Sequence, residues 1–174
     1  MNSITKNICI TALGIALFVV FSLCLQVPVF ENYYLCLGYV VLAVYCYSFG
    51  MKKGVLVGFL GVIVYCLLTS GLRGMPGWSL GNIVIAIATS LICSLTSKLN
   101  KKLVRHIIIA IVMVLSTAIG MLGVKSIVEC LLYSQPFLLR VAKNIYAFVA
   151  DSVVLILSIP ICFSLDSTIK KFLS

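Results

Sequence analysis

Charge is scarce in this chain of 174 residues, and acidic charge is scarcest. Only 10% of the residues are charged, with 4 Asp and Glu against 13 Lys and Arg, whereas 63% are hydrophobic. An ordinary soluble domain is about a quarter charged and about half apolar. This composition therefore excludes a typical soluble domain and predicts that a lipid bilayer solvates most of the chain.

Catalytic and metal-binding motifs are also missing. The only histidine, His106, borders a basic segment, and no serine, histidine and acid can be assembled on one side of a membrane. The eight cysteines contain no C-x-x-C pair, and most lie in apolar runs, where a thiol behaves as a small hydrophobe. No P-loop or G-x-G-x-x-G motif is present. We therefore expect no enzyme activity, no ATP hydrolysis, no metal and no cofactor.

The apolar residues fall into six runs, most of them near the roughly 20 residues that span a hydrocarbon core. Their expected bounds are 7–27, 34–49, 54–71, 79–97, 107–124 and 144–165. The first run is too long for the apolar part of a signal peptide and has no A-x-A site after it, so we expect it to remain as a helix. The predicted fold class is an all-α integral membrane protein, a single six-helix domain over residues 1–174.

The positions of lysine and arginine predict the orientation in the membrane. With the N-terminus inside, nine of the 13 basic residues fall on the cytoplasmic side. The four that fall outside are Arg73, Lys125, Arg140 and Lys143. Cytoplasmic loops of membrane proteins are enriched in lysine and arginine, so we expect both termini to be cytoplasmic in a multi-pass protein of the cell membrane. The net charge of +9 then reflects topology and not nucleic-acid binding.

Small residues recur at helical spacing in two of the runs. Ala12 and Ala16 are one turn apart in the first run, and small residues on one face let another helix approach closely. This pair predicts either docking of a partner protein or a contact within the bundle. Gly50, Gly54 and Gly58 form a stripe in the third run, which favours close packing over the alternative of a sliding helix.

Polar side chains inside the runs are the stronger indication of function, because each is costly in lipid without a partner or a role. Asn144 and Asp151 are seven residues apart and share a helical face, with Phe148 between them. Asn82 lies one turn after Trp78 on the face of another helix. Together these side chains predict a pocket open to the outside, with hydrogen-bonding groups and flat rings. The alternative for Asp151 is a buried pair with a lysine or arginine.

The segment "LLTSGLRGMPGWSLGN", from Leu67 to Asn82, joins two of the runs on the predicted outer side. Its glycines make it pliable, Pro76 restricts it, and Arg73 supplies a cation. The segment fits a loop that closes over a ligand. The alternatives are an arginine at the lipid phosphates and a belt of tyrosine and tryptophan at the membrane interface.

Several of these segments resemble the substrate-binding S components of energy-coupling factor (ECF) vitamin transporters. The similar features are the six-helix size, the A-x-x-x-A motif from Ala12 to Ala16, and the segment "LGYVVLAVYCYSFGMKKGVLVGFLG" followed by "WSLGNIVIAIATSLI". The segment "WSLGNIVIAIATSLI" in particular resembles the riboflavin-transporter-like branch. No residue set is diagnostic for one vitamin, and the start "MNSITKN" lacks the histidine of metal-transporting members.

The resemblance implies a mechanism. Such a subunit captures a vitamin-like heterocycle under its outer loops, docks through its first helix on a membrane scaffold subunit, and is driven by two ATPase subunits. Ala12 and Ala16 would form the docking face. The expected substrate-binding residues, matched by position only, are Arg73, Trp78, Asn82, Asn144, Phe148 and Asp151. The alternative is a small structural membrane protein without a transported ligand.

Overall fold

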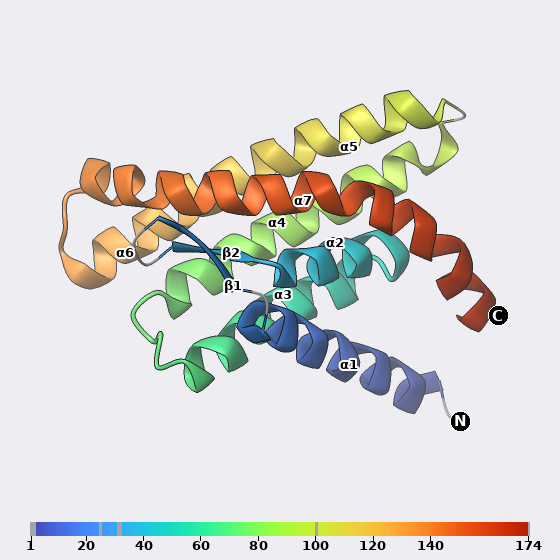
Figure 1. The fold of residues 1–174 in the computed structure, drawn as a ribbon, viewed down its shortest axis with the longest axis horizontal. Helices are drawn as coiled ribbons and strands as arrows, with labels where there is room; N and C mark the ends of the chain where they lie inside the picture. The colour runs from blue at the N-terminus through green and yellow to red at the C-terminus, as the bar shows by residue number, and fades with distance from the viewer. Residues whose placement is uncertain (1–2, 25, 31–32, 100, 174) are drawn as a thin grey trace.

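The computed structural model describes residues 3–24, 26–30, 33–99 and 101–173, and it is almost wholly helical (Figure 1). The helical elements are α1 (Ser3–Cys24), α2 (Gly38–Ser48), α3 (Met51–Leu68), α4 (Met75–Leu95), η1 (Thr96–Lys98), α5 (Lys102–Thr117), η2 (Ala118–Lys125), α6 (Ser126–Tyr133) and α7 (Phe137–Leu173). Two short strands, β1 (Gln26–Phe30) and β2 (Tyr33–Cys36), pair as an antiparallel hairpin between α1 and α2.

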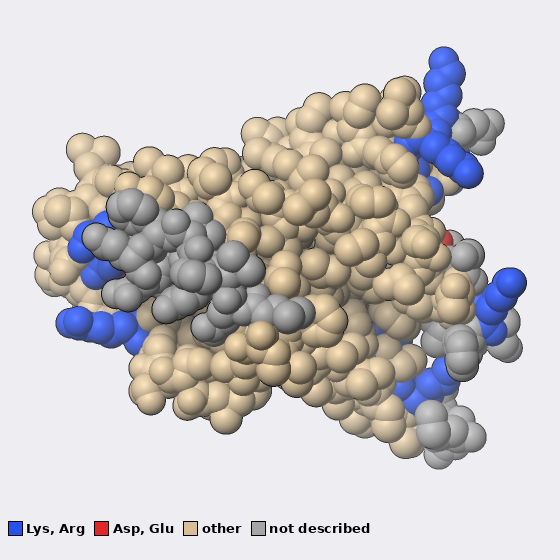
Figure 2. Space-filling model, viewed as in Figure 1, with Lys and Arg blue, Asp and Glu red and all other residues tan. Residues whose placement is uncertain are grey.

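Five helical segments within the described residues are long and apolar enough to cross a membrane, and α2 is a shorter apolar helix. One of the five is a single rod over Lys102–Tyr133, in which α5, the π-helix η2 and α6 follow one another without a break. Both chain ends lie at the same end of the bundle as the α4–α5 turn, and the α3–α4 and α6–α7 turns lie at the other (Figure 1). Lysine and arginine gather at both ends, with a wide uncharged band between them (Figure 2).

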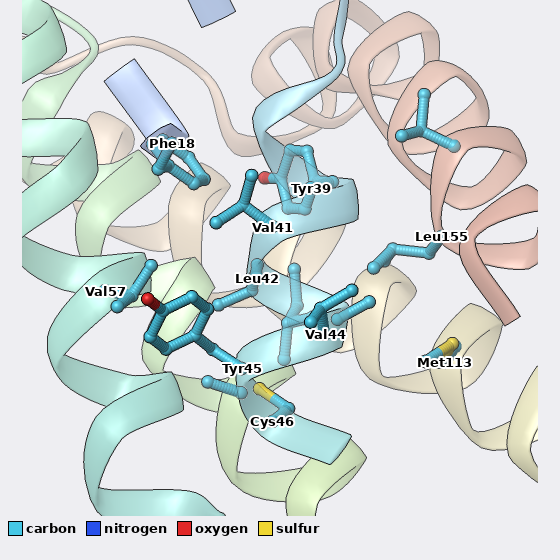
Figure 3. Packing of buried hydrophobic residues seen from close by; sticks show 14 of the residues in the cluster. Phe18, Tyr39, Val41, Leu42, Val44, Tyr45, Cys46, Val57, Met113 and Leu155 are labelled. Atoms are coloured by element: carbon cyan, nitrogen blue, oxygen red, sulfur yellow. The ribbon is translucent and has the colours of Figure 1, made fainter. Parts of the chain in front are cut away.

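The short helix α2 lies at the centre of the bundle and contacts α1, α3, α4 and α7. Eight of its eleven residues are buried, so little of its surface is left to face solvent or lipid. Tyr39 and Tyr45 project from it among Phe18, Val57 and Leu155, which come from three other helices (Figure 3). Helix α2 therefore supplies side chains along much of the length of the core.

Close helix contacts depend on the glycines of α3. A Cβ atom on Gly54 would lie 2.5 Å from Sγ of Cys46 in α2, and one on Gly61 would lie 2.6 Å from the ring of Phe18 in α1. Of the predicted stripe, Gly54 has this packing role, and so has Gly58, where a Cβ atom would lie 2.9 Å from Cδ1 of Leu42. Gly50 has a different role, since it joins α2 to α3 with a φ of 81°, which side-chain-bearing residues rarely adopt.

The hairpin corrects two of the predicted bounds. The first helix ends at Cys24 and not at residue 27, and the second begins at Gly38 and not at 34. Pro28 disfavours helical backbone in the residue before it, and the valines beside it favour a strand. The predicted runs at 54–71 and 79–97 are also shifted, because α3 begins at Met51 and α4 at Met75. Trp78 therefore lies in the first turn of a helix and not in the loop.

The largest correction concerns residues 125–143, which were expected to form a long outer loop. They form α6 and the first turns of α7, joined by a short turn at Ser134, whose φ is 51°, and Pro136. Within this stretch Ser126 and Glu129 are buried, and both accept a hydrogen bond from Asn144, the first residue of the last predicted run. Helix α7 extends on to Leu173, well past the expected end at 165.

Candidate functional site

Three of the predicted polar and aromatic side chains meet at a residue that the sequence did not single out, Tyr39. Its hydroxyl accepts a hydrogen bond from Nε1 of Trp78 at 2.8 Å and donates one to Oδ1 of Asn82 at 2.7 Å. The amide Nδ2 of Asn82 donates in turn to the carbonyl of Gly58 in α3 at 3.3 Å. Tyr39 and Asn82 are fully buried, so this chain of hydrogen bonds links α2, α3 and α4 inside the bundle.

Asp151 joins the same group from α7. Its carboxylate interacts with the hydroxyl of Tyr39 and with the charge of Lys125, and its side chain is only 5% exposed. A hydroxyl has a single proton to donate, so Tyr39 can serve Asn82 or Asp151 but not both. The group therefore has one hydrogen-bond acceptor in excess, which suits a ligand that brings an N–H donor.

The approach of η2 to α4 brings Lys125 into this region. A Cβ atom on Gly81 would lie 2.7 Å from the carbonyl of Gly120, and the reverse distance is the same, so the two backbones are in direct contact. Gly77 similarly faces the carbonyl of Lys125 at 3.0 Å. Single π-turns within helices are frequent at functional sites. Here the π-helix brings Lys125 close enough for its charge to act on Asp151.

The end of the hairpin lies close to Tyr39 and Asp151. Cys36, the last residue of β2, is buried, and its Sγ lies 3.2 Å from Oγ of Ser22 in α1. Burial first, and then the nearby charge of Asp151, raise the pKa of the Cys36 thiol to about 12. Very little thiolate is therefore present at neutral pH, and the thiolate is the reactive form.

Alkylation of Cys36 should consequently report on movement of the hairpin. In a variant with the other seven cysteines replaced by serine or alanine, we expect iodoacetamide to react with Cys36 at least about tenfold more slowly than with a single cysteine at Cys24, which is exposed at the end of α1. Mass spectrometry of timed samples measures both rates. Equal rates in the two variants would show that Cys36 is as accessible as an exposed cysteine, which would contradict its buried position.

A second polar cluster lies where the α3–α4 turn meets α6 and α7. Nδ2 of Asn144 donates to Oγ of Ser126 at 3.0 Å and to Oε2 of Glu129 at 3.2 Å, and Glu129 also pairs with Arg140 at 3.6 Å. The ring of Tyr133 lies between two guanidinium groups, and its hydroxyl donates to the backbone carbonyl of Arg73. These contacts tie the α3–α4 turn to the α6–α7 hairpin.

The predicted site residues are therefore divided between two neighbourhoods. Trp78, Asn82 and Asp151 meet around Tyr39, whereas Asn144 and Arg73 belong to the Glu129–Tyr133 cluster. Phe148 is half-buried against the apolar core. Tyr39 was missed because tyrosines were interpreted as interfacial. The sequence feature that could have identified it is its position inside an apolar run, where a tyrosine is buried. A buried tyrosine hydroxyl needs a hydrogen-bond partner, so a polar neighbour could have been expected.

The two alanines predicted to dock a partner protein lie on the surface of the bundle, as docking requires. Ala12 and Ala16 are both exposed on α1, and the buried residues of that helix, Gly14 and Phe18 among them, lie on its other face. The pair is therefore accessible to a partner. Within the described residues, no group of three or more His, Cys, Asp or Glu side chains is placed to hold a metal ion.

The helical bundle, its apolar surface and its buried polar core define a multi-pass membrane protein. The family model of the ECF-type riboflavin transporter S component matches residues 2–166, so the chain belongs to this family. No curated protein and no solved structure gives a significant match. The protein is the substrate-binding subunit of an ECF importer and not an enzyme, and the alternative of a purely structural membrane protein is not favoured.

Proposed function

We propose that the subunit captures riboflavin, or a flat heterocycle closely related to it, from outside the cell. In this proposal the single domain spans the membrane six times, α2 included, with both termini in the cytoplasm. The ligand passes to a shared membrane scaffold subunit and is released inside at the expense of ATP hydrolysed by two ATPase subunits. The family name supports a riboflavin-type ligand, and the bias of basic residues toward the end with the termini supports the orientation.

The group around Tyr39 is the observation on which the proposed binding site depends. It brings an indole, an amide and a carboxylate from α4 and α7 together near the outer end of the bundle, where helix packing alone would not require them. A heterocycle with an N–H group would donate to the surplus acceptor, Asp151 or Asn82. Trp78 is half-buried and in edge contact with Tyr65, with ring centroids 5.5 Å apart, and its indole is the flat ring on which a heterocycle would stack in this proposal.

The second cluster and the hairpin are proposed as the cover of the site. The contacts of Tyr133 with Arg73 and Arg140 join the two outer turns, and the hairpin end covers the group through Cys36. Arg73, Asn144 and Phe148 would then act at the rim, while Trp78, Asn82 and Asp151 act at the floor. Entry of the ligand requires the cover to move, since Tyr39 and Asn82 are fully buried.

Thermal unfolding of the purified subunit in detergent tests the proposal. A ligand present at 100 times its Kd adds about 2.7 kcal/mol to the free energy of unfolding, so riboflavin should raise the Tm by several degrees. Thiamine and biotin, at the same concentrations, serve as controls and should leave the Tm unchanged. A folded protein that responds to thiamine or biotin but not to riboflavin would contradict the proposed ligand, and one that responds to none would contradict the proposed site.

A further inference from the structure

Two apolar grooves flank the start of α3, at the end of the bundle that holds the chain termini. The larger, with a volume of about 780 Å³, lies between α1 and the α2–α3 turn, and its lining includes Ile8, Ala12, Ile15, Phe49 and Lys53. The smaller, about 470 Å³, lies on the α4 side and reaches Ile87. Both grooves share Met51, Lys52 and Leu56. A single turn of α3 therefore separates two apolar channels.

The two grooves meet at a positively charged point, the start of α3. Lys52 lines both grooves, and Lys53 lines the larger one, with its Nζ 5.2 Å from the centroid of the Phe49 ring. In α3, whose residues are all described, the first turn has no acidic residue and no side-chain cap. The free backbone N–H groups of a helix start add to the positive potential there.

We propose that an anionic diacyl phospholipid occupies these grooves, with its phosphate at Lys52 and Lys53 and one acyl chain on each side of α3. The shape argues for a molecule with one anionic head and two apolar chains. A helix of the scaffold subunit would fill the larger groove only and would leave Lys52 between two channels. Because Ala12 also lines the larger groove, the lipid covers part of the proposed docking face and must leave before the scaffold docks.

The experiment compares phospholipids that differ only in the head group. The subunit, purified in detergent, is incubated with equal amounts of phosphatidylglycerol and phosphatidylcholine that have identical chains, and native mass spectrometry measures which lipid it retains. Wild type should retain one phosphatidylglycerol in preference to phosphatidylcholine. Lys52→Gln/Lys53→Gln should lower that retention about 25-fold, because each of the two lysines near an anionic lipid contributes about fivefold.

Matched variants separate this site from a general basic surface. Lys101→Gln/Lys102→Gln removes an adjacent exposed pair from the α4–α5 turn and should change retention by less than about twofold. Leu56→Trp keeps both lysines but fills the wall that the grooves share, and it should lower retention of phosphatidylglycerol about tenfold. Leu56 is 44% exposed, so the bundle can accommodate this change, and an unchanged Tm verifies the fold.

Three results would overturn the proposal. Equal retention of the two lipids would show that the lysines do not select a head group. An equal loss in both lysine variants would indicate only a diffuse basic surface. Absence of retained phospholipid, with scaffold binding lost in Leu56→Trp, would assign the grooves to the scaffold subunit. The riboflavin response of the Tm reports separately on the outer site, so its failure is distinguishable from failure of the lipid site.

Discussion

Asp151→Asn is expected to weaken riboflavin binding by a factor of ten or more. A hydrogen bond to a charged group contributes about 1.5–3 kcal/mol, and the amide that replaces the carboxylate loses the charge while keeping the shape. Asparagine also retains an acceptor for the Tyr39 hydroxyl, so the fold should tolerate it better than alanine. Isothermal titration of the purified subunit with riboflavin measures the change in Kd.

Two further variants make the Asp151 result specific. Asp166→Asn makes the same chemical change about four helical turns farther along α7 and should leave the Kd unchanged within about twofold, since it lies about 20 Å from Asp151 along the helix. Tyr39→Phe removes the hydroxyl that orients Trp78 and Asn82 and should weaken binding by less than Asp151→Asn does. If Asp151→Asn is folded and binds riboflavin as tightly as wild type, Asp151 is not part of the site.

Ala16→Trp is expected to abolish uptake while leaving riboflavin binding intact. A tryptophan on the small-residue face prevents the close helix approach on which association in lipid depends. The alanine it replaces is exposed, so the bundle itself should not be disturbed. Uptake of labelled riboflavin by cells that co-express the scaffold and ATPase subunits should fall at least about tenfold, and titration of the isolated subunit should give an unchanged Kd.

The control for this prediction is a tryptophan at a position on another side of the bundle. Ile111 in the middle of α5 is 53% exposed, so Ile111→Trp should reduce neither binding nor uptake. Ala12→Trp should behave as Ala16→Trp does, because the two residues are one turn apart. Normal uptake by Ala16→Trp would place the docking surface elsewhere, and loss of riboflavin binding would mean that the residue supports the site from within the subunit.

Most helices could be located from hydropathy because lipid imposes a simple requirement on length and composition. The errors occur where polar side chains supply the contacts. Residues 125–143 were expected to be a loop, yet Ser126 and Glu129 lie in α6, are buried, and accept hydrogen bonds from Asn144 in α7. The hairpin was missed for a related reason, since strand pairing joins residues that hydropathy assigned to two helices.

In the candidate site too, the spacing within one helix was predicted correctly and the contacts between elements were not. Helical spacing correctly placed Trp78 and Asn82 on one face, because residues four apart are neighbours on any α-helix. Spacing also placed Asn144 and Asp151 on one face of α7. It did not show that their partners come from different elements, η2 and α2 for Asp151 and α6 for Asn144. Tyr39 was missed altogether, since nothing in its own segment distinguishes it from an interfacial tyrosine.

Composition and charge are properties of the chain alone, and they are sufficient for the membrane environment, the approximate positions of most apolar helices and the expected orientation. Each depends on a local quantity, hydrophobicity or basic charge, summed over a segment. The meeting of Trp78, Asn82 and Asp151 at one hydroxyl, and the two grooves that share Lys52, arise only when four or five helices pack. Those features depend on glycine contacts and helix register between segments far apart in the sequence, which no local pattern specifies.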